Sequence, residues 1–163
     1  MTQKIVLKLK NRLLIPLYFW LDSISLIGKE SRERTRFNKL LAERIEEING
    51  IKTTMIQPYV KTDNKGKAKL IEKKEKDASG NDFVRMVYDF KGNTQKEKFE
   101  KEWSEYLDEE LIIDVLEGNK SKIYTIKEIV LNTDQKFQGE MASVYDEWCI
   151  AFEALPPRQE AKR

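Results

Sequence analysis

The sequence predicts an α+β fold that is predominantly helical, with about four amphipathic helices and a small β-hairpin or sheet. Long stretches repeat apolar residues every three or four positions, which is the period of one helix face. Shorter stretches alternate side-chain character from residue to residue, as strands do. The chain has 163 residues, of which 40% are hydrophobic and 36% are charged. We therefore expect a single globular domain over residues 1–157 and a polar tail over 158–163.

The N-terminal segment predicts a short strand followed by a buried helix. In the strand, Ile5, Leu7 and Leu9 alternate with Val6, Lys8 and Lys10. The helix extends from about Pro16 to Ile27 and ends at Gly28, because glycine commonly terminates helices. The apolar run Leu13–Leu21 is too short to span a bilayer, and no small-residue cleavage site follows it. We therefore expect a core helix and no membrane partner.

A second helix is predicted from Ser31, the expected N-cap, to about Pro58. The pair Asn49-Gly50 is a potential stop within it. Apolar residues continue at helical spacing beyond this pair, so we expect the helix to pass through it. This apolar face comprises Phe37, Leu40, Leu41, Ile45, Ile48, Ile51, Met55 and Tyr59.

Between Lys61 and Gly80 the chain becomes polar and rich in lysine. After this segment, Val84 and Met86 alternate with Arg85 and Val87, the pattern of a strand. This predicts a hairpin in which Lys69–Lys73 pairs with Phe83–Phe90 across Lys74–Asp82. A solvated, flexible loop over residues 61–82 is the alternative interpretation.

Four further elements are predicted in the remainder of the chain. A third helix begins at Asn93 or Thr94 and ends near Glu110. Ile112, Ile113 and Val115 indicate a short strand, and Ile123–Leu131 is apolar enough for a strand or a helix. A last helix follows Gly139 and ends at Pro156-Pro157, because proline cannot continue a helix. Its apolar face comprises Val144, Tyr145, Trp148, Phe152 and Leu155.

The absence of histidine restricts the chemistry open to this chain. Nucleophile pairs of the Ser-His or Cys-His type are impossible, and so are zinc sites built from His and Cys, because Cys149 is the single cysteine. The seven glycines are scattered and form no phosphate-binding loop. We expect no enzymatic activity, no catalytic residue, no metal and no cofactor. One cysteine also permits no intramolecular disulfide, which favours a reducing cytoplasm.

Charge balance favours a protein partner over nucleic acid. Lys plus Arg total 30 and Asp plus Glu total 28, a formal net charge of +2. Proteins that grip nucleic acid over a long footprint usually carry a larger basic excess. A nucleic-acid partner is therefore the second choice.

Two basic segments are candidate partner-binding sites. Arg32, Arg34 and Arg36 lie at alternate positions in the expected first turns of the second helix, where they oppose the helix dipole. The alternative is that these arginines pair within the protein, with Glu30 or with carboxylates of the last helix. The second segment contributes Lys65, Lys67, Lys69, Lys73 and Lys74.

Two other groups of residues invite chemical interpretations. Tyr145-Asp146-Glu147-Trp148-Cys149 joins two carboxylates to the thiol. We favour a core role for Tyr145 and Trp148, with Asp146 and Glu147 meeting the arginines. Asp63 with Glu72 and Lys74 resembles the acidic pair plus lysine of Mg²⁺ nucleases, a spacing that also arises easily by chance.

Three stretches together resemble a family of small proteins from phages and prophages of Gram-positive bacteria, catalogued as a domain of unknown function. They are residues 26–41, from Leu26-Ile27-Gly28 through Ser31-Arg32-Glu33-Arg34-Thr35-Arg36-Phe37 to Leu40-Leu41; residues 59–66, ending Asp63-Asn64-Lys65-Gly66; and Ile129-Val130-Leu131-Asn132 followed by Tyr145 to Cys149 and Phe152-Glu153. Positions 68–92 fit poorly and look like a local insertion.

The resemblance implies a phage origin and brings no catalytic residues. With the composition, it leads us to expect a non-catalytic phage protein that binds another protein, of the host or of the phage, in the host cytoplasm. Inhibition of a host anti-phage defence system is one form of this function. The alternatives are a tail or virion assembly accessory and a nucleic-acid-binding protein. The oligomeric state stays open.

Overall fold

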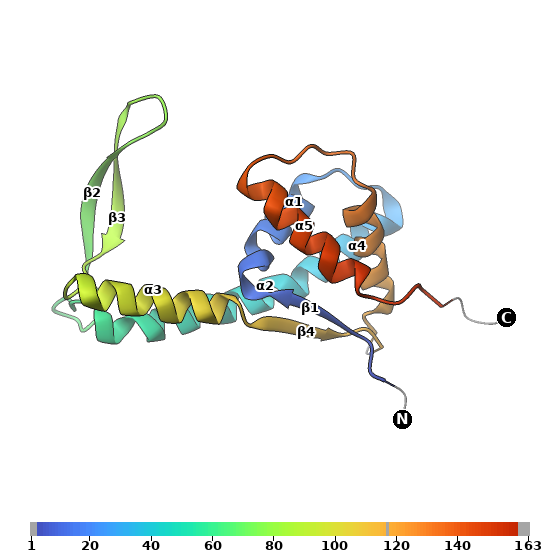
Figure 1. The fold of residues 1–163 in the computed structure, drawn as a ribbon, viewed down its shortest axis with the longest axis horizontal. Helices are drawn as coiled ribbons and strands as arrows, with labels where there is room; N and C mark the ends of the chain where they lie inside the picture. Colours follow the sequence, from blue (N-terminus) through green and yellow to red (C-terminus); the bar gives the residue numbers. More distant parts are fainter. Residues whose placement is uncertain (1–2, 117, 160–163) are drawn as a thin grey trace. The chain divides into compact units, whose positions relative to one another are not determined.

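A computed structural model describes residues 3–116 and 118–159 of the chain. Within them lie five α-helices and two separate two-stranded antiparallel sheets (Figure 1), which confirms the predicted fold class. In order, the elements are β1 (Val6–Lys10), η1 (Asn11–Leu13), α1 (Leu14–Ser23), α2 (Gly28–Ile56), η2 (Gln57–Tyr59), β2 (Leu70–Lys76), β3 (Asp82–Tyr88), α3 (Asn93–Leu107), β4 (Glu110–Asp114), α4 (Lys120–Asn132) and α5 (Glu140–Glu153).

The chain forms two compact units. One combines the described residues up to Ile48 with those from Leu107 onward, and the other spans Asn49–Tyr106. Helix α2 contributes to both. The expectation of a single domain over 1–157 stays a prediction, as does the polar tail, of which residues 160–163 lie outside the described part.

The first unit is built around β1, β4 and four helices. Strand β1 pairs antiparallel with β4, with Leu7 opposite Ile113, which confirms both predicted strands. Leu7 and Leu9 are fully buried, whereas Lys8 is exposed. The sheet therefore presents one face to the core and one to solvent.

Aromatic side chains fill the core of this unit. Trp148, Phe152 and Phe37 are completely buried. The indole of Trp148 lies 5.5 Å from that of Trp20, between ring centroids, and its Nε1–H donates to the carbonyl of Leu13 at 3.2 Å. That bond satisfies the one polar atom that the ring brings into the core. The stretch Ile123–Leu131, open between strand and helix in the sequence, belongs to helix α4.

The predicted boundary between the first two helices is wrong. Helix α1 ends at Ser23, because the backbone of Ile24 is extended. Ile27 is 86% exposed, so it does not continue the buried face of α1. Gly28 begins α2 and does not terminate α1. Its φ of +52° is in the left-handed region, which glycine adopts readily and which turns the chain into the new helix. Ser31 therefore lies inside the first turn and is not the N-cap.

Helix α2 passes through Asn49-Gly50 without interruption, as the apolar spacing predicted. Ile48 and Ile56 are buried on either side of this pair. Tertiary burial therefore outweighs the weak helix propensity of the two residues.

The second unit has a small core of its own. Ile56, Val60 and Phe99 are buried there, and Trp103 and Tyr59 pack against them. Strands β2 and β3 form the predicted hairpin with different bounds. Leu70–Lys76 pairs with Asp82–Tyr88, so β2 continues past Lys73 and β3 ends before Phe90. The turn of the hairpin is 77–81, shorter than predicted, because the Asp77 carboxylate accepts the N–H groups of Ser79 and Asn81 at 2.8 Å. The flexible-loop alternative is wrong for residues 70–76.

Candidate partner-binding surface

The three arginines at the start of α2 do not form one patch. The guanidinium of Arg34 donates to the carbonyls of Leu21 and Ile24 and contacts the Ser31 hydroxyl at 3.4 Å. These carbonyls belong to the C-terminal end of α1 and the residue that follows it, where backbone acceptors lack helical partners. Arg34 therefore ties α1 to α2 and has little capacity left for a partner.

The other two arginines differ from Arg34 and from each other. Arg36 pairs with the carboxylate of Glu33 at 3.2 Å, and Glu33 is only 4% exposed. Arg32 is exposed, and its side chain makes no hydrogen bond or ion pair with any described residue. Arg32 and Arg36 line a shallow hollow of about 450 Å³ with Gly28, Lys29 and Glu33. Within the described chain no carboxylate of α5 pairs with these arginines, so the expected contacts to Asp146 and Glu147 are wrong.

The segment around Trp148 has the core role expected of it. Trp148 is fully buried, and the ring of Tyr145 stacks on Phe137 with centroids 4.3 Å apart. The Tyr145 hydroxyl donates to the carbonyl of Val130 at 2.7 Å. Burial raises the pKa of Tyr145 to about 12, with a smaller contribution from a hydrogen bond to Cys149. Cys149 itself is half-buried.

The five candidate lysines lie on the hairpin and on the turn before it. Lys65 and Lys67 are in a turn closed by Asp63, whose carboxylate accepts the backbone N–H of both residues at 2.8 and 3.0 Å. Lys69 lies 3.9 Å from the Asp89 carboxylate, and Lys73 lies 3.3 Å from that of Glu75. Lys65, Lys67 and Lys74 form no ion pair with a described residue. The lysines are thus distributed along residues 65–74 and not gathered at one point.

The register of the hairpin separates its side chains into two faces. Residues directly opposite one another in an antiparallel pair lie on the same face. Leu70 is opposite Tyr88, Glu72 opposite Met86, Lys74 opposite Val84, and Lys76 opposite Asp82. We call this set the Leu70 face. The remaining pairs are Ile71 with Val87, Lys73 with Arg85 and Glu75 with Phe83.

The Leu70 face carries apolar side chains that stay about half exposed in the described chain. Leu70 is 48% exposed, and Val84 and Met86 are each 54% exposed. Lys74 lies among them, directly opposite Val84. Sequence reasoning recognised Val84 and Met86 as strand residues and missed them as a surface. The signal was present, since two-stranded hairpins have no core to bury such residues.

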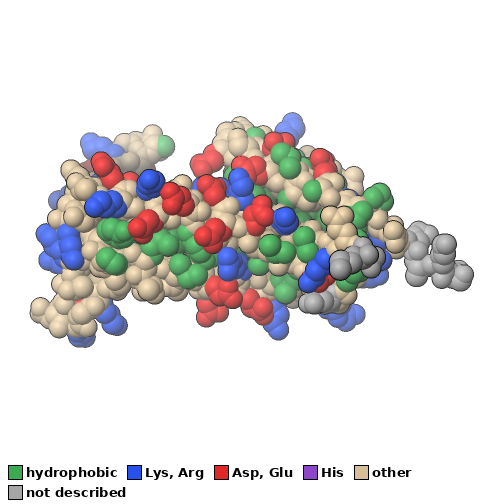
Figure 2. Space-filling view, turned by 60° about the horizontal axis from the view of Figure 1, so that its bottom comes forward, with side chains coloured by type: hydrophobic (Ala, Val, Ile, Leu, Met, Phe, Trp, Pro, Cys, Tyr) green, Lys and Arg blue, Asp and Glu red, His purple; other side chains and the backbone are tan. Residues whose placement is uncertain are grey.

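The opposite face of the hairpin combines three apolar residues with a cluster of charges. The apolar residues are Ile71, Val87 and Phe83, of which Ile71 is 41% and Phe83 42% exposed. The Glu75 carboxylate pairs with Arg85 at 2.9 Å and with Lys73 at 3.3 Å. These cations lower the pKa of Glu75, the hydrogen bond from Lys73 having the largest effect. The charges therefore pair both along β2, between Lys73 and Glu75, and across to β3, between Glu75 and Arg85. Charged side chains of both signs are likewise interspersed on the face of the molecule drawn in Figure 2.

The residues considered for a nuclease site have other placements. Asp63 closes the turn before β2, while Glu72 and Lys74 are in β2 on the Leu70 face. In the part of the chain that the structure describes, no group of three or more His, Cys, Asp or Glu side chains is arranged to hold a metal ion. None of the described helices is both long and apolar enough to cross a membrane.

Comparisons with known proteins do not add to this geometry. No family model, curated protein or solved structure matches the chain. The resemblance to the phage family therefore stays an expectation drawn from the three stretches of sequence.

Proposed function

We propose that this protein acts by binding another protein, without catalysis, and that the Leu70 face of hairpin β2–β3 is its principal contact. The observation that carries this proposal is the exposure of Leu70, Val84 and Met86 side by side on a two-stranded sheet. Apolar surface left in water costs roughly 25 cal/mol per Å². A contiguous exposed apolar surface commonly marks a protein interface.

The hairpin has the physical character of an element completed by a partner. A lone two-stranded hairpin is marginally stable in water, and a further covering layer normally stabilises it. The unpaired cation Lys74 lies opposite Val84 within the apolar group. A partner surface that is apolar at its centre and presents a carboxylate to Lys74 satisfies both features.

The biological setting is part of the same proposal. The resemblance to phage proteins supports a phage origin and the host cytoplasm as the site of action. Within that setting we place inhibition of a host anti-phage defence protein first and a role as a tail or virion assembly accessory second. An inhibitor binds its target in uninfected cells, whereas an assembly accessory needs phage structural proteins.

The experiment is a comparative pull-down with the full-length protein and two matched double variants. Val84→Ser with Met86→Ser removes apolar groups from the Leu70 face. Ile71→Ser with Phe83→Ser removes groups of similar exposure, 41% and 42%, from the opposite face. The lysates come from a Gram-positive host, infected and uninfected, each with and without nuclease treatment. Captured proteins are identified by mass spectrometry, and circular dichroism is the folding check.

We expect the wild type and the Ile71/Phe83 variant to retain the same partner in stoichiometric amount, and the Val84/Met86 variant to lose it. A partner present in uninfected lysate indicates a host protein, and one present only after infection indicates a phage protein. Equal capture by both variants overturns the assignment of the Leu70 face. Loss of every partner on nuclease treatment replaces the proposed function with nucleic-acid binding.

A further inference from the structure

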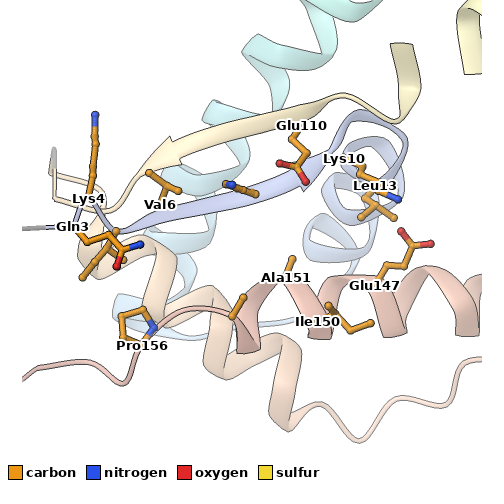
Figure 3. A pocket seen from close by; sticks show the side chains of 13 residues that line it. Gln3, Lys4, Val6, Lys10, Leu13, Glu110, Glu147, Ile150, Ala151 and Pro156 are labelled. Atoms are coloured by element: carbon orange, nitrogen blue, oxygen red, sulfur yellow. The ribbon is translucent and has the colours of Figure 1, made fainter. Parts of the chain in front are cut away.

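A second surface lies in the other unit, in a groove between strand β1 and helix α5. The groove has a volume of about 810 Å³ (Figure 3). Val6, Lys8 and Lys10 of β1 line one side, and Ile150, Ala151 and Ala154 line the other. Figure 3 shows β4 on one side of β1 and α5 on the other. The groove therefore runs along the edge of β1 that β4 does not occupy.

The hydrogen bonds around β1 show which backbone groups point to that free edge. The N–H of Val115 donates to the carbonyl of Ile5 at 3.1 Å, and the N–H of Asn11 donates to the carbonyl of Glu109 at 2.8 Å. Leu7 lies opposite Ile113, and in an antiparallel pair only every second residue bonds to the neighbouring strand. The backbone N–H and C=O groups of residues 5, 7, 9 and 11 therefore face β4. The backbone groups of Val6, Lys8 and Lys10 consequently point away from β4.

Most of these edge groups have no hydrogen-bond partner within the described chain. The carbonyl of Lys10 begins the 3₁₀ turn η1, for which Lys10 is the N-cap. The N–H and C=O groups of Val6 and Lys8 and the N–H of Lys10 remain. An edge of this kind is a template for another strand.

The side chains along the groove define what kind of strand fits. Lys8 is exposed, forms no ion pair with a described residue, and lies opposite the apolar Ile112 on β4. Lys10 is opposite Glu110, so the two side chains lie on the same face of the sheet. The α5 side is apolar at Ile150, which is 58% exposed, and at two alanines, while Glu147 of α5 lines the groove at its Lys10 end (Figure 3). A strand that fits this groove therefore carries a carboxylate opposite Lys8 and apolar side chains at the positions that alternate with it.

We propose that an extended segment of a partner protein, with alternating acidic and apolar residues, adds antiparallel to the free edge of β1 in this groove. The residue opposite Lys8 donates to and accepts from the Lys8 backbone while its carboxylate meets the Lys8 ammonium group. The neighbouring apolar residues pack against Ile150 and Ala151. This surface is separate from the Leu70 face, so either proposal stands or falls alone.

A second copy of the chain is a poorer occupant of the edge than an acidic segment. In the fully overlapped antiparallel register, Lys8 of one copy lies opposite Lys8 of the other. Like charges directly opposite one another destabilise a strand pair, and lysines on edge strands are a common safeguard against self-association.

The first test uses the full-length protein and a synthetic hexapeptide of alternating glutamate and valine, followed by NMR. We expect saturable binding and slower hydrogen exchange at the amides of Val6, Lys8 and Lys10. In antiparallel addition the glutamates share the Lys8 face, so their amides form the bonds to β1. N-methylation of the glutamate amides should weaken binding at least tenfold, and N-methylation of the valine amides should leave it within about twofold.

The second test separates the backbone contact from the charge. Lys8→Ala removes the ammonium group alone, and Lys8→Pro removes the edge N–H as well. Because the Lys8 N–H does not bond to β4, proline is tolerated there as on other edge strands. We expect a several-fold loss of peptide affinity in Lys8→Ala and a further tenfold loss in Lys8→Pro, with thermal unfolding as the folding check.

Absence of peptide binding at millimolar concentration overturns the proposal, and so does equal binding of the two N-methylated peptides. Concentration-dependent dimerisation of the free protein, accompanied by protection of the Lys8 amide, overturns it in favour of a second copy. The peptide experiments need no variant to fold, so the proposal stays testable if Lys8→Pro is unstable.

Discussion

At the scale of single residues, neighbours in the arginine triplet have different roles. Arg34 satisfies carbonyls at the end of α1, while Arg32 contacts no described polar partner. We predict that Arg34→Ala lowers the free energy of unfolding by about 1–3 kcal/mol, because it leaves half-buried carbonyls without donors. Urea unfolding of the purified protein measures this difference.

Arg32→Ala is the matched control for that measurement. It removes the same charge from the same helix end but no hydrogen bond within the described chain. We expect its unfolding free energy to stay within about 0.5 kcal/mol of the wild type. Equal destabilisation by the two variants would contradict the role assigned to Arg34.

The sequence correctly located a basic segment at Arg32, Arg34 and Arg36. It did not predict which groups each arginine side chain contacts. Alternate residues on a helix point in different directions, which separates Arg34 from Arg32 and Arg36. The partners of Arg34 are backbone carbonyls of Leu21 and Ile24. Every residue has a backbone carbonyl, so the pattern of side chains in the sequence cannot indicate that these two carbonyls accept from Arg34.

Tyr145 gives a prediction at high pH. Its pKa is raised to about 12 from 10.0, chiefly by burial. A raised pKa means that the folded state favours the neutral phenol. The associated stability is complete below pH 10 and is lost as the pH rises from about 10 to 12.

We therefore expect wild type minus Tyr145→Phe to show a tyrosinate absorbance that titrates near pH 12. Over the same range the wild type should lose more unfolding free energy than Tyr145→Phe does. A difference spectrum that titrates near 10, the ordinary tyrosine value, would show that the ring is not buried as described.

At the scale of elements, the spacing of apolar residues predicted the extent of the helices better than single helix-breaking residues such as glycine did. The stripe that includes Ile48 and Met55 carried α2 through Asn49-Gly50. Gly28 was assigned as the stop of one helix and is the start of the next. Both positions depend on which apolar neighbours become buried, and single-residue propensity does not contain that information.

The two glycines of α2 should respond to substitution in opposite directions. Gly50 is inside the helix, and an added Cβ would meet nothing within 4 Å. Gly50→Ala should therefore raise the unfolding free energy by about 0.5–1 kcal/mol. Gly28, with φ of +52°, should lose about 1 kcal/mol on substitution by alanine, because a Cβ strains the left-handed conformation.

Thermal and urea unfolding of the two glycine variants measure both effects. They form an internal pair, since each adds one methyl group to open space in the same helix. If Gly50→Ala destabilises the protein, the prediction is contradicted, because the helix then requires glycine at a position where a Cβ has open space.

At the scale of the whole molecule, periodicity along the sequence predicted the fold class. Which elements pack against one another was visible only in the structure. The buried cluster of Ile56, Val60 and Phe99 combines residues more than thirty positions apart in the chain. Periodicity reports which face of an element is apolar but not which other element covers it. For the same reason the free edge of β1 was not foreseen, since it depends on which strand pairs with β1 and where α5 lies.

The net charge of the whole molecule favours a protein partner over nucleic acid. With 30 basic and 28 acidic residues, attraction to phosphate has to come from a local surface. Of the five candidate lysines, Lys69 and Lys73 are paired with the carboxylates of Asp89 and Glu75, which leaves Lys65, Lys67 and Lys74. Three phosphate contacts give only a shallow dependence of affinity on salt and weak binding overall.

We therefore predict no measurable binding of labelled duplex DNA or single-stranded RNA by fluorescence anisotropy at about 100 mM salt. At about 20 mM salt any residual binding should be weak, and Lys65→Ala with Lys67→Ala and Lys74→Ala should abolish it. Submicromolar affinity that falls steeply with salt would contradict this, because the free cations named here are too few to produce it. Such a result would move the contact surface from the apolar Leu70 face to the lysines that flank it.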